Sequence, residues 1–216
     1  NGPHTVATND GILAFTVTAE TDALLDLAGT RAMTGDGVTL ARDIKSRDAA
    51  SVGDYGAAFG SSTTAENYGA AFGSSTTAGD SGAAFGVGTT AGNSGAAFGA
   101  GTMAGYAGAA FGYGTTAGDH GAAFGSYTRA ENFGAAFGFE TVAGDHGAAF
   151  GDSTVAGYAG AAFGEGTTAG GYGAAFGSST TAGEYGAAFG EGTVAGVWGF
   201  SAGRDAHGST GSFVFA

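Results

Sequence analysis

The Gly-Asp-Ser-Gly string around Ser81 is the first candidate for chemistry, because a serine in such a loop could act as a nucleophile. A catalytic serine needs a histidine and an aspartate that converge on it in a rigid site. The same positions recur as Gly-Asn-Ser-Gly at residues 92–95 and as Gly-Asp-His-Gly at residues 118–121. We therefore interpret the string as a turn that repeats along the chain.

The Asp-His pairs at residues 119–120 and 145–146 are the second candidate, because both side chains can bind metal ions. They occupy the same point of repeated segments two repeats apart, so stacking would separate them by roughly 10 Å. One ion with bonds of ~2 Å cannot bridge that gap. Calcium would need roughly six or more oxygens, and each repeat offers one Asp or Asn. Cysteine is absent, so thiolate sites are excluded. We expect no catalytic residue, no metal site, no cofactor and no enzyme activity.

The element that positions all these residues is a 13-residue repeat. Eleven units run without insertion over residues 56–198, with the template Gly-Ala-Ala-Phe-Gly-x-x-Thr-x-Ala-Gly/Glu-x-x. We number the positions of each unit as places 1 to 13. Degenerate units flank the array, at residues 49–55 and from residue 199 onward. Such periodicity is the sequence signature of a stacked repeat architecture.

Thirteen residues are too few for a helical hairpin, and the frequent glycines disfavour a helix. Two short strands and two tight turns fit this length, with the glycines at places 5 and 11 opening the turns. The sequence therefore predicts an all-β fold, a parallel β-solenoid (β-roll) of 13-residue two-strand coils. The solenoid spans residues 49–216, and residues 1–48 form an N-terminal cap or docking segment.

Side chains alternate between the two faces of a strand, so the orientation of one place in the unit determines the orientation of the places next to it. The residues at one place in successive units form a column along the stack. Phe at place 4 occurs in all eleven units, and we expect it to point into the solenoid together with Ala at place 2. On the opposing strand, Thr at place 8 and Ala at place 10 are expected to point inward. Place 9, which includes Arg129, is expected to point outward.

By the same alternation, place 3 is predicted to face outward, although it is Ala in every unit. Monomeric proteins rarely expose an apolar strip of this length. We predict that the strip binds a second copy of the chain or another regular surface. It consists of Ala58, Ala71, Ala84, Ala97, Ala110, Ala123, Ala136, Ala149, Ala162, Ala175 and Ala188.

The first 48 residues differ in composition from the array. Residues 11–19 read as a strand, and residues 21–29 as a short capped helix or a second strand. Capping the first coil is the expected role of the segment. A second hypothesis is head-to-tail docking by strand addition, which would propagate a filament. The residues predicted for that docking are Ile12, Ala14, Thr16, Phe213 and Phe215.

Net charge constrains the partners. The chain carries 19 acidic residues against six Lys and Arg, a formal net charge of −13. Nucleic-acid binding needs a basic patch, so we expect no nucleic-acid partner. No apolar run approaches the ~18 residues of a membrane span, so we expect no membrane insertion.

The string Ala-Phe-Gly-x-x-Thr-x-Ala-Gly-x-x-Gly-Ala-Ala-Phe-Gly resembles the head repeats of YadA-like trimeric autotransporter adhesins and related β-roll repeats of phage tail fibres. The resemblance covers residues 49–216. It implies a left-handed β-roll, a trimer, and a surface that binds matrix or host molecules. Phe stands here where those repeats usually carry Ile or Val.

These observations predict a non-enzymatic structural or adhesive subunit of an extracellular or virion surface fibre. Its expected partners are further copies of the chain, in a trimer or filament, and a glycan or protein on a host surface. The alternative is an ice-binding solenoid, because regular Thr columns and flat Gly-Ala strips suit an ice-facing surface. On that alternative, the place 3 strip would face ice, because Arg129 interrupts the outward column at place 9.

Overall fold

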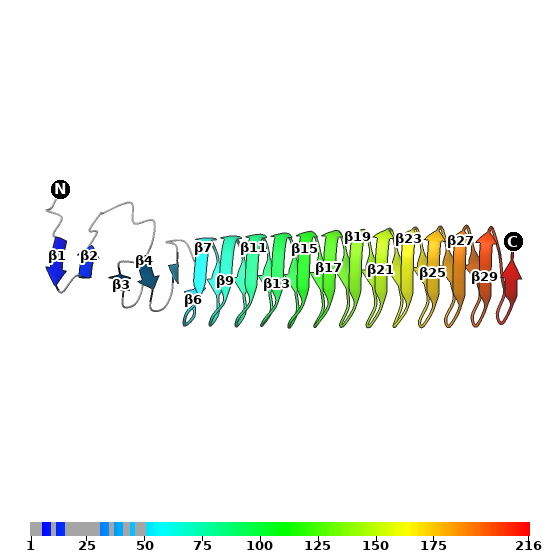
Figure 1. Cartoon of the computed structure of the whole chain (residues 1–216), viewed down its shortest axis with the longest axis horizontal. Helices are drawn as coiled ribbons and strands as arrows, with labels where there is room; N and C mark the ends of the chain where they lie inside the picture. Colours follow the sequence, from blue (N-terminus) through cyan, green and yellow to red (C-terminus); the bar gives the residue numbers. More distant parts are fainter. Residues whose placement is uncertain (1–5, 10–11, 16–30, 35–36, 41–43, 46–50) are drawn as a thin grey trace.

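The computed structural model describes residues 6–9, 12–15, 31–34, 37–40, 44–45 and 51–216. Over these residues the chain consists of strands and turns and contains no helix. No helix long and apolar enough to cross a membrane is therefore present in the described part. Residues 51–216 form a regular stack of coils that extends as a rod (Figure 1).

One side of the rod is a 14-stranded parallel sheet, here called the wide sheet. Its strands within the array cover places 2 to 6 and pair in register, so that Phe98 lies beside Phe111. In spatial order they are β5 (Ile44–Lys45), β7 (Ala57–Ser61), β9 (Ala70–Ser74), β11 (Ala83–Val87), β13 (Ala96–Ala100), β15 (Ala109–Tyr113), β17 (Ala122–Ser126), β19 (Ala135–Phe139), β21 (Ala148–Asp152), β23 (Ala161–Glu165), β25 (Ala174–Ser178), β27 (Ala187–Glu191), β29 (Phe200–Arg204) and β30 (Phe213–Phe215).

The other side is a 12-stranded parallel sheet of two-residue strands, here called the narrow sheet. Its strands within the array cover places 9 and 10. They are β6 (Ser51–Val52), β8 (Thr64–Ala65), β10 (Thr77–Ala78), β12 (Thr90–Ala91), β14 (Met103–Ala104), β16 (Thr116–Ala117), β18 (Arg129–Ala130), β20 (Val142–Ala143), β22 (Val155–Ala156), β24 (Thr168–Ala169), β26 (Thr181–Ala182) and β28 (Val194–Ala195). The predicted parallel β-solenoid of two-strand coils is confirmed.

The N-terminal region contributes two antiparallel pairs and one strand of the wide sheet. β1 (Val6–Asn9) pairs with β2 (Ile12–Phe15), and β3 (Arg31–Thr34) pairs with β4 (Gly37–Leu40). β5 pairs with β7, so the wide sheet begins before the predicted boundary at residue 49. Of the strand predicted over residues 11–19, residues 12–15 form β2, and the remaining residues lie outside the described part of the chain, as do residues 21–29. Whether residues 1–48 cap the solenoid stays a prediction.

Both turns of each coil contain a residue with positive φ. At the turn after the narrow sheet, the Gly69 N–H donates to the Glu66 carbonyl at 3.0 Å, and Tyr68 at place 13 has φ 58°. At the turn after the wide sheet, place 7 has positive φ, as at Ser75 with φ 54°. The N–H groups of both corner residues also donate to carbonyls of the preceding coil, at 2.9 Å each. Backbone hydrogen bonds therefore connect neighbouring coils at the corners as well as in the sheets.

Glycine at place 5 lies inside each wide-sheet strand and does not open a turn, so that prediction is wrong. Gly99, for example, belongs to β13 and has φ 134°. A Cβ atom at Gly99 would lie 1.8 Å from the carbonyl oxygen of Gly112 in the next coil. The place 5 column is therefore glycine because neighbouring backbones approach too closely for any side chain.

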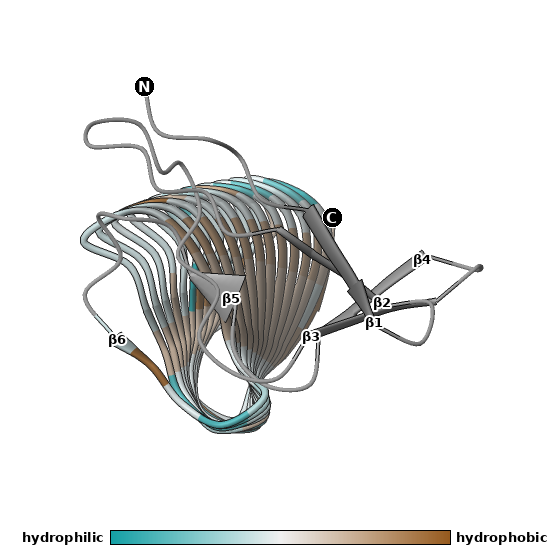
Figure 2. Ribbon diagram, turned by 90° about the vertical axis from the view of Figure 1, so that its left-hand side faces the viewer, coloured by the Kyte–Doolittle hydropathy of each residue, from teal (hydrophilic) through white to brown (hydrophobic). Residues whose placement is uncertain are grey.

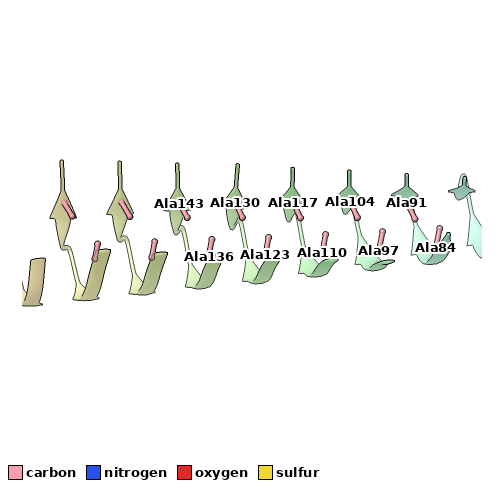
Figure 3. Close-up of a cluster of buried hydrophobic side chains, with 14 of the residues drawn as sticks. Ala84, Ala91, Ala97, Ala104, Ala110, Ala117, Ala123, Ala130, Ala136 and Ala143 are labelled. Atoms are coloured by element: carbon pink, nitrogen blue, oxygen red, sulfur yellow. The ribbon is translucent and has the colours of Figure 1, made fainter. Parts of the chain in front are cut away.

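The interior of the rod contains only small side chains. Thr at place 8 is 0–1% exposed and Ala at place 10 is at most 5% exposed, so the predicted inward direction of both columns is confirmed. Ala of the wide sheet and Ala of the narrow sheet face one another across a thin space (Figure 3). Viewed along the rod, hydrophilic residues lie at the turn that follows the narrow sheet and also along the opposite edge of the cross-section (Figure 2).

Candidate interaction surface

The predicted binding strip at place 3 lies inside the protein. Every alanine of the strip is 0% exposed, and the side chains point toward the narrow sheet (Figure 3). The outward direction predicted for them is therefore wrong, because the space between the two sheets is too thin for Phe and admits only Ala and Thr. The residues concerned are Ala58, Ala71, Ala84, Ala97, Ala110, Ala123, Ala136, Ala149, Ala162, Ala175 and Ala188. None of them can contact a partner or ice while the coils are intact.

Phe at place 4 points outward instead, and Ala at place 2 points outward beside it. The Phe side chains are partly exposed, up to 38% at Phe189. Successive rings stack face to face, with centroids 4.8 Å apart and planes within 5° from Phe72 to Phe150. That spacing equals the distance between neighbouring strands, so each strand adds one ring to the column. We call this outer side of the wide sheet, with its columns at places 2 and 4, the Phe face.

The coil at residues 199–211 exchanges the two columns. Phe200 pairs with Ala187 at place 2, and Ala202 pairs with Phe189 at place 4. The ring of Phe200 lies 5.8 Å from that of Phe189, tilted by 35°, and stacks on Phe213 at 4.8 Å. Every coil from residue 56 to residue 211 thus presents one Phe and one Ala on the Phe face.

The edge of the Phe face at place 6 changes character along the rod. From β11 to β19 this edge carries the exposed apolar side chains of Val87, Tyr113 and Phe139. In its C-terminal half it carries the carboxylates of Glu165 and Glu191, and Glu191 forms an ion pair with Arg204 at 3.0 Å. At the adjoining turn, hydrogen bonding to Tyr113 and its charge raise the pKa of Tyr127.

A second aromatic column runs along the corner at places 12 and 13. Each of eight consecutive coils contributes one ring, and consecutive centroids lie 4.1–5.9 Å apart. Where place 13 is Ala, a Tyr at place 12 supplies the ring, a compensation that is readable in the sequence. Four of the seven neighbouring pairs stack face to face, and the other three meet edge to face. They belong to Tyr106, His120, Phe133, His146, Tyr158, Tyr172, Tyr185 and Trp198.

The Asp and Asn side chains at place 12 hydrogen-bond the coils to one another. The Asn132 Oδ1 accepts the N–H of Asp119 at 2.9 Å, and the Asp145 Oδ1 accepts the N–H of Asn132 at 3.0 Å. Asp80 and Asn93 make the same contact at 3.2 Å. Asp and Asn alternate along both runs of this ladder, so no two of its carboxylates lie in adjacent coils. The place 12 side chains therefore have a structural explanation that needs no ligand.

The two chemical candidates of the sequence occupy ordinary turns. Ser81 has φ 56°, and its N–H donates to the Asn67 carbonyl at 2.8 Å. His120 and His146 stack on opposite faces of Phe133, each with centroids 5.0 Å from it. In the described part of the chain no three His, Asp or Glu side chains gather as a metal site would require.

The place 9 column points outward from the narrow sheet, as predicted. Met103 is 52% exposed, and Arg129 pairs with Glu131 of the same coil. These two side chains interrupt the Thr and Val residues of the column. The flat Gly-Ala strip that was predicted as the ice-facing surface is buried.

The residues predicted for head-to-tail docking occupy different surroundings. Ile12 and Ala14 lie in β2, where they pair with β1, and Thr16 lies outside the described residues. Phe213 and Phe215 lie in β30 beside β29, with exposures of 70% and 69%. Docking between these strands stays a prediction.

Comparison with known proteins adds no family assignment. No family model matches the chain, and no curated protein matches its sequence.

Proposed function

We propose that this chain is a non-enzymatic structural rod, a subunit of an extracellular or virion surface fibre that works as a homo-oligomer. The observation that carries the proposal is the Phe face, a regular apolar surface on the outside of a straight array of coils. An apolar surface of this size is rarely left in water by a monomeric protein. Self-association through the Phe face replaces the contact first predicted for the buried alanines.

The charge distribution supports the same function. Places 1 to 5 contain no charged residue in any of the eleven units, although the chain carries a net charge of −13. Acidic side chains at the turns and edges keep the other surfaces soluble and repel unspecific contacts. The uncharged face is then the place where copies can meet. The remaining outer surfaces, including the corner aromatic column, would serve adhesion to a glycan or protein of a host.

The test is the solution mass of the wild-type chain, measured by light scattering behind a sizing column at low and high salt. The chain has a mass of 20.5 kDa. We expect a multiple of this mass, and stronger association at high salt, because salt screens repulsion between acidic copies and strengthens apolar contacts. A monomer at both salt concentrations would contradict the proposal. An ice-growth assay would then be the next experiment, with the place 9 column as the candidate surface.

A further inference from the structure

We propose that two copies of this chain pack with their Phe faces together and their rods parallel, so that identical coils lie opposite each other. In this arrangement the Phe column of each copy lies against the place 2 column of the other. The inference rests on the proposed self-association and adds the partner, the orientation and the register.

The shape of the Phe face supports this pairing. Phe at place 4 forms a continuous ridge, and Ala at place 2 forms a shallower column beside it, about 7 Å away along the strand. Two ridges in direct opposition would hold both Ala columns away from the partner, leaving gaps that lose dispersion contacts. A ridge that lies over the partner's Ala column fills the space on both sides of the interface.

Symmetry decides which orientation allows this fit. A closed pair of identical chains has a twofold axis, and each patch meets its own copy. A twofold axis along the strands turns the rods antiparallel and sets Phe against Phe. A twofold axis along the rod, placed over place 3, reverses the strand direction and sets place 4 against place 2. Only the parallel orientation therefore fits the ridge into the Ala column.

The coil at residues 199–211 supplies an independent argument. Its Phe200 stands at place 2 and its Ala202 at place 4, the reverse of the eleven coils before it. In a parallel pair this coil faces its own copy, so Phe200 lies opposite Ala202 and the fit continues. The exchange of Phe and Ala in this coil is therefore compatible with a pair in which identical coils lie opposite each other.

The size of the face is sufficient for a specific pair. With the twofold axis over place 3, places 2 to 4 of each strand lie opposite the partner; three residues at ~3.3 Å each, over eleven strands at ~4.8 Å, give a flat area of about 500 Å² per copy. The two copies together then bury about 1,000 Å², which is the lower end of the range for specific protein pairs. A partner with the same 4.8 Å ring spacing can match the column over its whole length, and a second copy of the chain has that spacing.

Three matched single-cysteine variants test the arrangement by spin-label distance measurement. The chain contains no cysteine, so each introduced thiol is unique. Ser61→Cys, Ser126→Cys and Ser178→Cys all alter place 6 on the outer side of the wide sheet, at the start, centre and far part of the array. In the parallel pair, place 6 lies three residues from the twofold axis. The distance between the two labels is then about 20 Å for all three variants.

The outcomes separate the orientation from the proposed function. Distances of about 20 Å at all three positions support the parallel pair. An antiparallel pair would give about 50 Å at Ser61, about 10 Å at Ser126 and about 40 Å at Ser178, which overturns the orientation and leaves self-association intact. Oligomers in which the two labels at Ser126 lie farther apart than about 20 Å would overturn packing through the Phe face. A mass of one chain for all labelled variants and for wild type would contradict both the arrangement and the proposed function.

Discussion

The rings of Phe98 and Phe111 lie 4.8 Å apart with planes within 3° of parallel, on the outer side of the wide sheet. Ala97 and Ala110, their neighbours in the chain, are completely buried on the inner side. Each coil therefore has its largest apolar side chain outside and its smallest inside. Consequently, the stability of a coil and the association of copies depend on different columns and can be changed separately.

Enlarging a buried alanine should destabilise the rod. Ala97→Leu would force a larger side chain between the two sheets, and we expect a loss of about 3 kcal/mol or more in unfolding free energy. Ala100→Leu, in the same strand but partly exposed at place 6, is the matched control and should change stability little. Thermal unfolding followed by circular dichroism measures both. Equal melting temperatures for the two variants would contradict the assignment of place 3 to the interior.

The place 5 glycine should be irreplaceable. Gly99→Ala would add a Cβ atom 1.8 Å from the Gly112 carbonyl oxygen at a backbone φ of 134°. We expect a loss of more than about 3 kcal/mol, because backbone strain and the clash act together. Gly101→Ala in the same coil also has positive φ, 62°, but its nearest atom is 3.9 Å away. It should cost about 1 kcal/mol, and a comparable effect of the two substitutions in thermal melts would be inconsistent with the close approach at place 5.

Carboxylates in adjacent coils should repel. Asn132→Asp keeps the acceptor for the Asp119 N–H but places a charge between Asp119 and Asp145. We expect a loss of about 1 kcal/mol per neighbouring carboxylate at low salt, largely recovered at 1 M salt, where the screening length is about 3 Å.

Asn93→Asp is the control for that substitution, because one of its two neighbours in the column is Tyr106 and only Asp80 is acidic. Its loss should be about half as large. If both variants lost the same stability at low and at high salt, repulsion between carboxylates would not be the reason that Asp and Asn alternate in this column.

Much of this fold could be predicted from the repeat. The unit length, the two strands, the turn at place 11, and the inward Thr and Ala columns follow from the pattern of residues 56–198. The sequence did not predict which face of the wide-sheet strand points inward, because the prediction chose the most apolar side chain, Phe at place 4, as the interior residue. Hydrophobicity favours Phe inside, whereas the thin space inside a 13-residue coil excludes it.

The invariance of Ala at place 3 did not separate the interior from the Phe face. Places 2 and 4 point outward and are as constant in the eleven units as place 3, so constancy marks the buried columns and the Phe face alike. The buried partners of place 3, Thr at place 8 and Ala at place 10, are equally constant. The stacking of exposed Phe rings was not predictable from alternation, because it depends on in-register neighbours 13 residues away.

Exchanging Ala and Phe between places 2 and 4 of one coil, in two steps, should first weaken association and then restore it. Ala96→Phe puts two ridges on one coil, so the partner's Phe98 meets a ring where it had a shallow column, and we expect weaker association. Adding Phe98→Ala recreates the pattern of Phe200 and Ala202, and association should recover if identical coils lie opposite each other. Sedimentation over a dilution series measures both. A double variant no stronger than the single one would contradict same-coil opposition.

The central claim, that copies associate through the Phe face, is tested most directly by adding charge to it. Phe85→Asp with Phe163→Asp places two carboxylates on the Phe face, while Thr90→Asp with Thr168→Asp places two in the same coils on the narrow sheet. Light scattering should report a single 20.5 kDa chain for the Phe variant and the wild-type oligomer for the Thr variant, both with β-type circular dichroism. An unchanged oligomer in the Phe variant, or dissociation in the Thr variant alone, would contradict the account.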